Sequence, residues 1–295
     1  MNILITGATG FVGKNLVAEL KENNELHILM RPGSKWANLG IERVVEFTDD
    51  ISSLANYMME HHIVGVVHLA SLYIAEHKSE DIKDLVMSNV FLGTALLEAC
   101  KVSRVKWFLN TGTIWQNYQA KDYTDQYNPV NLYAASKQAF ITMAKFYTET
   151  SDIRFCTLKL CDTFGPNDTR KKIFKLFNDN AESGKVMDMS PGEQKIDILY
   201  ITDVISGFVR LISLLNSKED LEEEYVLSSG FQLPLKSVAL EFEKVSGLKL
   251  NIKWGGRPYR DREVMVPWKG TILKGWKPEV TLEEGISKFV ESLSS

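Results

Sequence analysis

The sequence is poor in cysteine and has no excess of basic residues. Its three cysteines, Cys100, Cys156 and Cys161, form no C-x-x-C pair. An odd count without such a pair argues against a disulfide framework or a zinc site and favours a reducing cytosol. The formal net charge of −4 provides no general basic surface. We therefore expect neither nucleic acid nor an acidic membrane as a partner.

Long apolar segments are also missing. No apolar stretch approaches the roughly 18 residues that a transmembrane helix needs. The chain starts with Met1 and Asn2 and shows neither the charged n-region nor the apolar h-region of a signal peptide. The five histidines have no metal-ligand spacing. These absences predict a cytoplasmic protein without a bound metal.

Short apolar runs alternate with helical patterns over the first 160 residues. The runs are rich in Val, Ile, Leu and Phe and are bounded by turn or polar residues, which favours buried strands. Such alternation predicts an α/β protein with a doubly wound parallel sheet. The predicted strands span residues 3–6, 26–30, 44–47, 63–70, 106–110 and 155–160, and the predicted helices span residues 11–22, 51–62, 79–101 and 132–150.

The regular alternation ends near Leu160, where residues 164–168 form a strong turn cluster. Beyond it we expect helices over 169–183 and 202–216, strands over 194–201 and 248–254, a helix after Pro234 and a terminal helix opened by Thr281. The predicted organisation is a Rossmann domain over residues 1–163, to which residues 194–222 return. A smaller C-terminal α/β substrate lobe comprises residues 164–193 and 223–295.

A glycine-rich loop follows the first predicted strand, where residues 6–13 read T-G-A-T-G-F-V-G. Gly7 suits the tight turn, Gly10 lets a pyrophosphate approach the backbone, and Gly13 lets the helix pack closely on the strand. The helix N-terminus offers free N–H groups to the anion. The loop predicts a dinucleotide site. Its expected contacts are Gly7, Thr9, Gly10, Phe11, Val12 and Gly13.

The end of the second strand bears on cofactor choice. NAD-selective sites usually place an acid there for the ribose hydroxyls, but this strand is followed by Arg31, Ser34 and Lys35. Arg31 and Lys35 are suited to a 2′-phosphate, so we predict NADP, with NAD as the alternative. Arg31 as a solvated loop charge also stays open. Asp50 (or its neighbour Asp49) either meets the adenine amino group or caps the helix after it.

Tyr133 and Lys137 form a Y-x-x-x-K pair on one face of a predicted helix. Lowering the tyrosine pKa by about three units takes about 4 kcal/mol. An ammonium about 4 Å away supplies roughly that much at an effective dielectric of about 20. We therefore predict Tyr133 as the proton donor or acceptor and Lys137 as its tuning cation. Thr111, at the end of the fifth strand, is the candidate hydrogen-bond donor to the reacting oxygen, with Thr113 close behind.

These motifs resemble those of the extended short-chain dehydrogenase/reductases, the NAD(P)-dependent sugar epimerase/dehydratase family. Further segments share the resemblance: His68-Leu69-Ala70, Asn89-Val90, Gly93-Thr94, Gly165-Pro166 and Gly275-Trp276-Lys277-Pro278. The resemblance implies a nucleotide-diphosphate sugar as substrate. It also implies a homodimer through the helices at 79–101 and 132–150, with Lys137 holding the nicotinamide ribose. Further cofactor contacts implied by it are Leu69, Ala70, Ser71, Asn89 and Leu160, and implied substrate contacts are Thr113 and Asp162.

Departures from the family pattern narrow the reaction. Family dehydratases carry Asp-Glu directly after the catalytic Thr, whereas Gly112 and Thr113 follow Thr111 here. The acid expected of epimerases after the second strand is absent. Where the family often has Arg-Asp, this chain has Ile196-Asp197, so the diphosphate falls to Arg260 or Arg257 unless these are solvated loop charges.

The segments at 260–265 and 275–278 resemble nucleotide-sugar 4-ketoreductases. We therefore predict NADPH-dependent 4-keto reduction of a nucleotide-linked deoxysugar. The alternatives are a nucleotide-sugar 4-epimerase, another oxidoreductase acting on a small carbonyl, and a non-catalytic NADP sensor.

Overall fold

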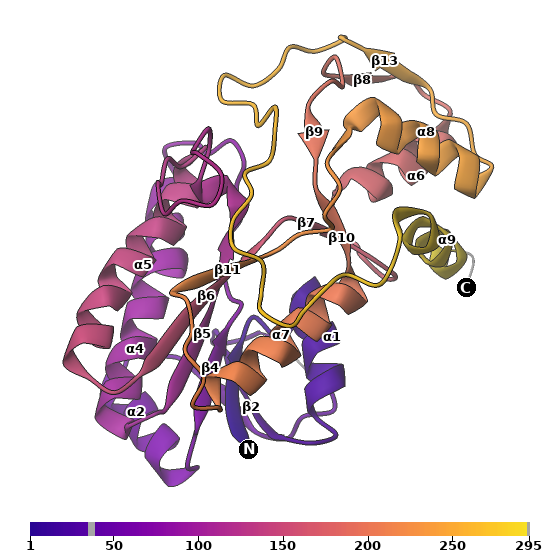
Figure 1. Ribbon diagram of the computed structural model, residues 1–295. Coiled ribbons are helices and arrows are strands. Elements are labelled where there is room, and N and C mark those ends of the chain that lie inside the picture. Colours follow the sequence, from indigo (N-terminus) through magenta and orange to yellow (C-terminus); the bar gives the residue numbers. More distant parts are fainter. Residues whose placement is uncertain (35–38, 294–295) are drawn as a thin grey trace.

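The computed structural model describes residues 1–34 and 39–293 and is built around one parallel sheet of seven strands (Figure 1). The strand order is β11-β6-β5-β4-β1-β2-β3, and every pairing is parallel. The order reverses between β1 and β4, where open α/β sheets bind ligands. The strands are β1 (Asn2–Thr6), β2 (Glu25–Met30), β3 (Val44–Glu46), β4 (Gly65–His68), β5 (Trp107–Thr113), β6 (Arg154–Leu160) and β11 (Glu224–Leu227).

Helices cover both faces of the sheet, which confirms the predicted doubly wound architecture (Figure 1). Helices α1 (Phe11–Leu20) and α7 (Ile201–Leu215) pack on one face, and α2 (Ile51–Glu60), α4 (Leu92–Ser103) and α5 (Leu132–Thr150) on the other. Within β1, Ile3 and Ile5 face the first group and Leu4 faces the second. Because both faces are buried, the strands are apolar along their whole length.

One helical stretch, Asp81–Ser103, is long and apolar enough to cross a membrane by length and composition, with a mean hydropathy of 1.4 over its best window. The expectation that no segment would meet this test is wrong here. The stretch combines α3 (Asp81–Val86), a π-helical segment η1 (Met87–Phe91) and α4. Of the 18 residues over which this hydropathy is averaged, 44% are buried, and α4 packs between α2 and α5. The buried face of this stretch is apolar because the neighbouring helices cover it.

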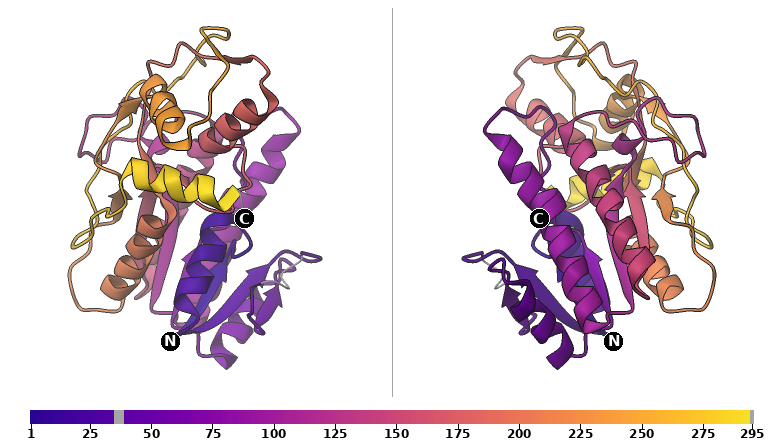
Figure 2. Two further views of the ribbon diagram at one scale, coloured as in Figure 1. Left: turned by 90° about the vertical axis from the view of Figure 1, so that its right-hand side faces the viewer. Right: turned by 90° about the vertical axis from the view of Figure 1, so that its left-hand side faces the viewer.

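A smaller lobe lies beyond the carboxyl ends of the strands (Figure 2). Phe174, Phe177, Phe242 and Phe289 pack ring against ring at its centre. Its helices are α6 (Ile173–Ser183), α8 (Leu235–Ser246) and α9 (Leu282–Leu293), and its two-stranded sheets pair β8 (Met187–Met189) with β13 (Ile252–Trp254) and β9 (Lys195–Ile196) with β12 (Leu233–Pro234). A third pair, β7 (Asp162–Phe164) with β10 (Ile198–Tyr200), joins the lobe to the main sheet.

The predicted division at residue 223 is wrong by one strand. Residues 224–227 form β11, which pairs with β6 at the edge of the main sheet. The crossover through α7 carries the chain back along the sheet, so the next strand adds beside β6. Conversely, β9 falls in the segment expected to return to the main domain, but it pairs with β12 of the lobe.

The C-terminal segment also returns to the main domain before α9. The buried Asp203 carboxylate of α7 accepts hydrogen bonds from the backbone N–H groups of Glu279 (3.1 Å) and Val280 (3.0 Å). The Trp276 indole donates to the Asp203 carbonyl oxygen (3.1 Å). Two chain-distant segments are thereby joined at the start of α7, so the lobe and the main domain are interwoven.

Candidate active site

The glycine loop between β1 and α1 has the geometry expected of it. Gly7 has a φ of +72°, and a Cβ placed there would lie 2.6 Å from the backbone nitrogen of Ala70. A Cβ on Gly13 would lie 2.2 Å from the Gly7 carbonyl oxygen. Helix α1 starts after Gly10 with no side-chain cap and no acid in its first turn. Its first N–H groups, including those of Phe11 and Val12, therefore suit an anion such as a dinucleotide pyrophosphate.

The loop after β4 is fixed against the glycine loop. The N–H of Ala70 donates to the Thr6 hydroxyl (3.1 Å), and that hydroxyl lies 2.8 Å from Nδ1 of His68. The N–H of Leu69 donates to the Thr6 carbonyl oxygen (3.3 Å). The structure thus brings Leu69 and Ala70 beside the glycine loop at the point where the strand order reverses.

Arg31 is exposed directly after β2, and no hydrogen bond or ion pair of its guanidinium is present within the described residues. Sequence reasoning missed Glu46, the last residue of β3. It lies beside Met30 in the β2–β3 register and accepts a hydrogen bond from the N–H of Gly33 (3.2 Å). Lys35 lies outside the described residues. One carboxylate oxygen of Asp50 accepts a hydrogen bond from the N–H of Ser53 (3.0 Å) and so caps α2. This is one of the two roles predicted for Asp50.

Tyr133 and Lys137 are both buried near the start of α5. Burial raises the pKa of Tyr133 to about 12, the Tyr73 hydroxyl adds to this, and Lys172 and Ser71 oppose it. Burial lowers the pKa of Lys137 to about 8, and the charge of Lys137 acts on His68. That Lys137 lowers the pKa of Tyr133 during the reaction stays a prediction. The charge of Lys172 lowers the pKa of Tyr133, against the larger effect of burial.

Two threonines at the end of β5 differ in their contacts. Thr111 Oγ1 is buried and has no hydrogen-bond partner in the described part of the chain. Thr113 instead caps the 3-10 helix η2 (Ile114–Gln116), where its hydroxyl accepts from the N–H of Trp115 (3.3 Å) and its N–H donates to Gln116 (2.9 Å). A buried hydroxyl without a partner is costly. Thr111 therefore has the unsatisfied group that a ligand oxygen would complete.

Asn89 is buried in the π-helical segment η1, which the sequence did not predict. Its side chain accepts from the N–H of Leu72 (2.7 Å) and donates to the Leu72 carbonyl (2.9 Å) and to the Ser136 hydroxyl (2.9 Å). Asn89 thus fixes the loop that carries Ser71 and Tyr73 and ties that loop to α5. Extra π-turns often mark functional positions in helices.

The predicted substrate residue Asp162, in β7, pairs with Lys172 just before α6 (2.9 Å). The Lys172 ammonium lies 4.9 Å from the centroid of the Tyr73 ring, and that ring meets Tyr133 edge-on at 5.0 Å. Leu160 ends β6 close by in the chain. Sequence reasoning missed Lys172 and Tyr73. The only available signal for Lys172 was the basic run at 170–172 that precedes α6.

A cavity of about 460 Å³ lies between the start of α5 and the 259–264 loop. Trp115 and Asn131 line it on one side, and Glu76 and Arg260 pair across it (2.8 Å). Arg260 is therefore brought to the Tyr133 side of the molecule. Arg257 lies within the smaller lobe instead, where its backbone N–H donates to the Met189 carbonyl oxygen in β8 (3.2 Å).

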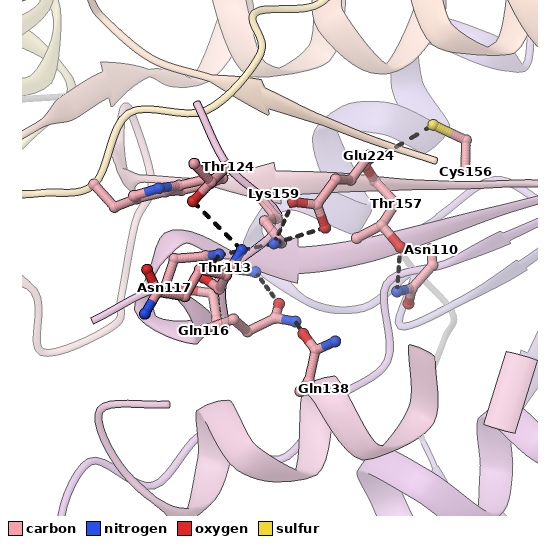
Figure 3. A network of polar contacts seen from close by, with 12 residues as sticks. Asn110, Thr113, Gln116, Asn117, Thr124, Gln138, Cys156, Thr157, Lys159 and Glu224 are labelled. Atoms are coloured by element: carbon pink, nitrogen blue, oxygen red, sulfur yellow. Dashed lines mark hydrogen bonds and ion pairs between the residues drawn. The ribbon is translucent and has the colours of Figure 1, made fainter. Parts of the chain in front are cut away.

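A buried lysine in β6 connects several chain segments by polar contacts (Figure 3). Lys159 in β6 pairs with Glu224 of β11 (2.7 Å) and donates to Asn117 Oδ1 (2.8 Å). The Trp268 ring lies 5.0 Å from its ammonium. These contacts join four chain segments, which agrees with a structural role for Lys159.

His68 makes stability sensitive to acid. Burial, followed by the charge of Lys137, lowers its pKa from 6.5 to about 3. Between these values the unfolded chain binds a proton that the folded chain excludes. The free energy of unfolding should therefore fall as the pH drops from 6.5 toward 3, by up to about 1.4 kcal/mol per pH unit from this residue.

Urea unfolding at stepwise pH checks this expectation with His68→Gln, which keeps a polar group near Thr6. The variant should show a shallower loss of stability over the acidic range than the parent. Both proteins keep His27, whose pKa is lowered to about 4 mainly by burial, so the difference between the slopes isolates His68. Equal slopes would contradict the assignment.

No group of three or more His, Cys, Asp or Glu residues suited to a metal occurs within residues 1–34 and 39–293. The polar groups that gather at the carboxyl edge of the sheet are a tyrosine, two lysines and a threonine, beside a glycine turn. This arrangement fits acid-base chemistry next to a dinucleotide.

Comparison with known proteins agrees with this arrangement. The profile of the NAD dependent epimerase/dehydratase family matches residues 3–227. CDP-abequose synthase of Salmonella muenchen is 28% identical over 295 residues, covering 98% of this chain and 96% of that protein. The structure of UDP-glucose 4-epimerase from Thermotoga maritima with UDP-glucose has a TM-score of 0.85 at 19% identity, covering 100% and 99% of the two chains.

UDP-glucuronic acid 4-epimerase from Bacillus cereus, in complex with UDP-glucuronic acid and NAD, also has a TM-score of 0.85, at 21% identity and with 100% and 99% coverage. These structures share the fold. The family match covers the glycine loop, Thr111, Tyr133 and Lys137. The chain therefore belongs to the NAD dependent epimerase/dehydratase family, the extended short-chain dehydrogenase/reductases, and is an oxidoreductase that uses a nicotinamide dinucleotide.

Proposed function

We propose that this protein catalyses the NADPH-dependent reduction of a 4-keto group on a nucleotide-diphosphate-linked deoxysugar. The observation that carries the proposal is the partnerless buried hydroxyl of Thr111. Thr111 lies near the carboxyl end of β5, and the tyrosine of the Y-x-x-x-K pair lies in α5, which packs on β5. A hydroxyl and a phenol at one sheet edge suit a carbonyl oxygen that gains a proton.

Each residue has a separate role in the proposed reaction. Thr111 donates a hydrogen bond that holds the substrate oxygen, and Tyr133 transfers its proton to that oxygen. Bound NADPH supplies the hydride. Lys137 holds the nicotinamide ribose. The other residues that would hold the dinucleotide are Gly7, Thr9, Gly10, Phe11, Val12, Gly13, Arg31, Asp50, Leu69, Ala70, Ser71, Asn89 and Leu160.

The substrate would occupy the 460 Å³ cavity, with Asp162 as a further expected contact. Arg260 is our candidate for the diphosphate, because its guanidinium reaches this cavity, and the substrate would have to displace Glu76 from it. Arg257 could meet only a part of the substrate that extends to β8. Thr113 would act through its backbone turn, since its hydroxyl already caps η2.

Reduction is favoured over dehydration because Gly112 and Thr113 follow Thr111, so no acid pair is available for removing water. The similarity to CDP-abequose synthase over nearly the whole chain supports a 4-keto reduction. The pair Tyr133 and Lys137 argues against a sensor without chemistry.

A nucleotide-sugar 4-epimerase is the second candidate, and Glu46 is the observation that favours it. This carboxylate lies beside the turn that carries Arg31. Acids near this position hold the ribose hydroxyls of NAD. The epimerase structures that share the fold include one in complex with NAD.

The test of the proposed reaction is NADPH consumption, followed by absorbance, with CDP-, dTDP- and UDP-4-keto-6-deoxysugars and with NADH in parallel. Rapid loss of NADPH with one of these sugars would support the ketoreductase. No consumption with any of them, together with NAD carried through purification, would overturn it in favour of the epimerase.

Arg31 and Glu46 predict opposite effects on coenzyme preference. Arg31→Ala should weaken NADPH binding about tenfold, since it removes a charge-assisted contact at an exposed site, and should leave NADH binding unchanged. Glu46→Gln is the matched control and should weaken NADH binding without loss of NADPH affinity. Fluorescence titration of both variants with both coenzymes checks this, and unchanged NADPH affinity in Arg31→Ala would contradict the NADP assignment.

We also propose a homodimer formed through the α3–α4 stretch and α5. Ile82, Val86, Met143 and Phe146 on these helices are exposed, at 45%, 46%, 45% and 57%. Pairing with a second copy would bury this apolar surface. Phe146→Glu should convert the dimer to a monomer in analytical ultracentrifugation, and a parent protein that sediments as a monomer would contradict the proposal.

A further inference from the structure

A cation other than the predicted one lies beside the acid-base tyrosine. Lys172, directly before α6, pairs with Asp162 of β7 (2.9 Å). Its ammonium also lies over the Tyr73 ring (4.9 Å), which meets the Tyr133 ring at 5.0 Å and 81°. Three separate chain segments therefore hold one positive charge against the Tyr73 ring, which in turn contacts Tyr133.

Lys137 is held differently. It is 2% exposed, and no hydrogen bond or ion pair of its ammonium occurs among residues 1–34 and 39–293. Its charge lowers the pKa of His68, after the larger effect of burial. The charge of Lys137 therefore acts on His68 in β4, and the charge of Lys172 acts on Tyr133.

The two ammonium groups also differ in how long they keep their charge as the pH rises. Burial lowers the pKa of Lys137 to about 8. Asp162 raises the pKa of Lys172 above its usual range, against the effect of burial. Lys172 should therefore keep its positive charge to higher pH than Lys137.

We propose that Lys172 is a positioning residue of the active site, whose positive charge, held in place by Asp162 and the Tyr73 ring, favours the ionised form of the Tyr133 hydroxyl. This inference rests on the proposed role of Tyr133 in proton transfer. The cation acts through Tyr133 and not on the reacting atoms.

The other charged groups around this cluster are few. Arg170 lowers the pKa of Lys172, but its guanidinium is paired with the buried Asp168 (2.7 Å). Arg260 lowers the pKa of Tyr73, after the larger effects of burial, Lys172 and Asp162, and is itself paired with Glu76. Since both arginines have acidic partners close by, their effect on Tyr133 is partly cancelled.

The test is a titration of one residue, 3-fluorotyrosine placed at position 133 alone and followed by its ¹⁹F resonance, with and without NADP⁺. This phenol is more acidic than tyrosine, and its shift reports ionisation directly. Lys172→Met should raise the midpoint by about one pH unit, the order of effect of one nearby, partly screened charge. Lys172→Arg keeps the charge and should restore the parent midpoint.

Lys171→Met is the matched control, because Lys171 is the exposed neighbour in the sequence and should leave the midpoint unchanged. The pair Asp162→Asn and Asp162→Asn/Lys172→Met separates the cation from the unmasked carboxylate. The double variant should titrate at higher pH than Asp162→Asn alone. Circular dichroism confirms that each variant is folded over the range used.

Equal midpoints in the parent and Lys172→Met would overturn the proposal, as would a phenol that stays neutral in the parent over the whole range. The titration needs no sugar substrate. A shifted midpoint in a protein that reduces no sugar would refute the proposed reaction and support the role of Lys172. An active enzyme with equal midpoints would refute the role of Lys172 alone.

Discussion

Replacing Tyr133 with Phe is expected to lower kcat about 10²- to 10⁴-fold, the usual contribution of a positioned acid-base group. The ring remains, so its edge-on contact with Tyr73 (5.0 Å) and its burial are kept. Only the hydroxyl group, which would give its proton to the substrate oxygen, is removed. Affinity for NADPH should therefore be unchanged, because the glycine loop and Lys137 are untouched. Steady-state kinetics and fluorescence titration measure the two quantities separately.

The control for this substitution lies on the same helix. Tyr147 is also buried in α5, at 7% exposure against 8% for Tyr133, but lies nearly four turns further along. Tyr147→Phe should leave kcat unchanged within about twofold. A fully active Tyr133→Phe enzyme would exclude Tyr133 as the proton donor. Equal losses in both variants would show that the effect arises from packing.

The main sheet and the glycine loop could be predicted from sequence because their signals are local. Strand, turn and helix follow one another within residues 2–20, and the atoms that a Cβ on Gly13 would meet belong to Gly7 and Ala8 of the same unit. The Y-x-x-x-K spacing likewise places Tyr133 and Lys137 on one face of α5. No knowledge of distant segments is needed for these inferences.

The charged side chains around the site could not be predicted from sequence, because strand pairing and the packing of distant segments bring them there. Glu46 reaches the Arg31 turn only because of the β2–β3 register. Lys172 reaches the Tyr73 ring, which contacts Tyr133, because β7 and the segment before α6 meet the loop after β4. Spacing along a helix likewise does not show which buried groups an ammonium faces. The loop at 255–263 has no periodicity, so Arg257 and Arg260 could not be told apart.

Glu224→Gln is expected to lower the free energy of unfolding by about 3 kcal/mol at neutral pH, since it leaves a buried ammonium without its counter-charge. Lys159 has 2% of its side chain exposed, whereas Glu224 has 28%. Burial lowers the pKa of Lys159, and Glu224 opposes that effect. Without Glu224, the folded state should hold the lysine proton less tightly than the unfolded chain does. The loss of stability should therefore shrink as the pH rises and the lysine becomes neutral.

Lys159→Met makes the comparison decisive, because it removes the buried charge and leaves the more exposed carboxylate, which water can solvate. It should cost less than Glu224→Gln, and the double variant Lys159→Met/Glu224→Gln should be more stable than Glu224→Gln alone. Urea unfolding of the three variants at neutral and alkaline pH measures these differences. If Glu224→Gln were as stable as the parent, Asn117 and the Trp268 ring would suffice to hold the ammonium. The ion pair between β6 and β11 would then contribute nothing to the free energy of unfolding.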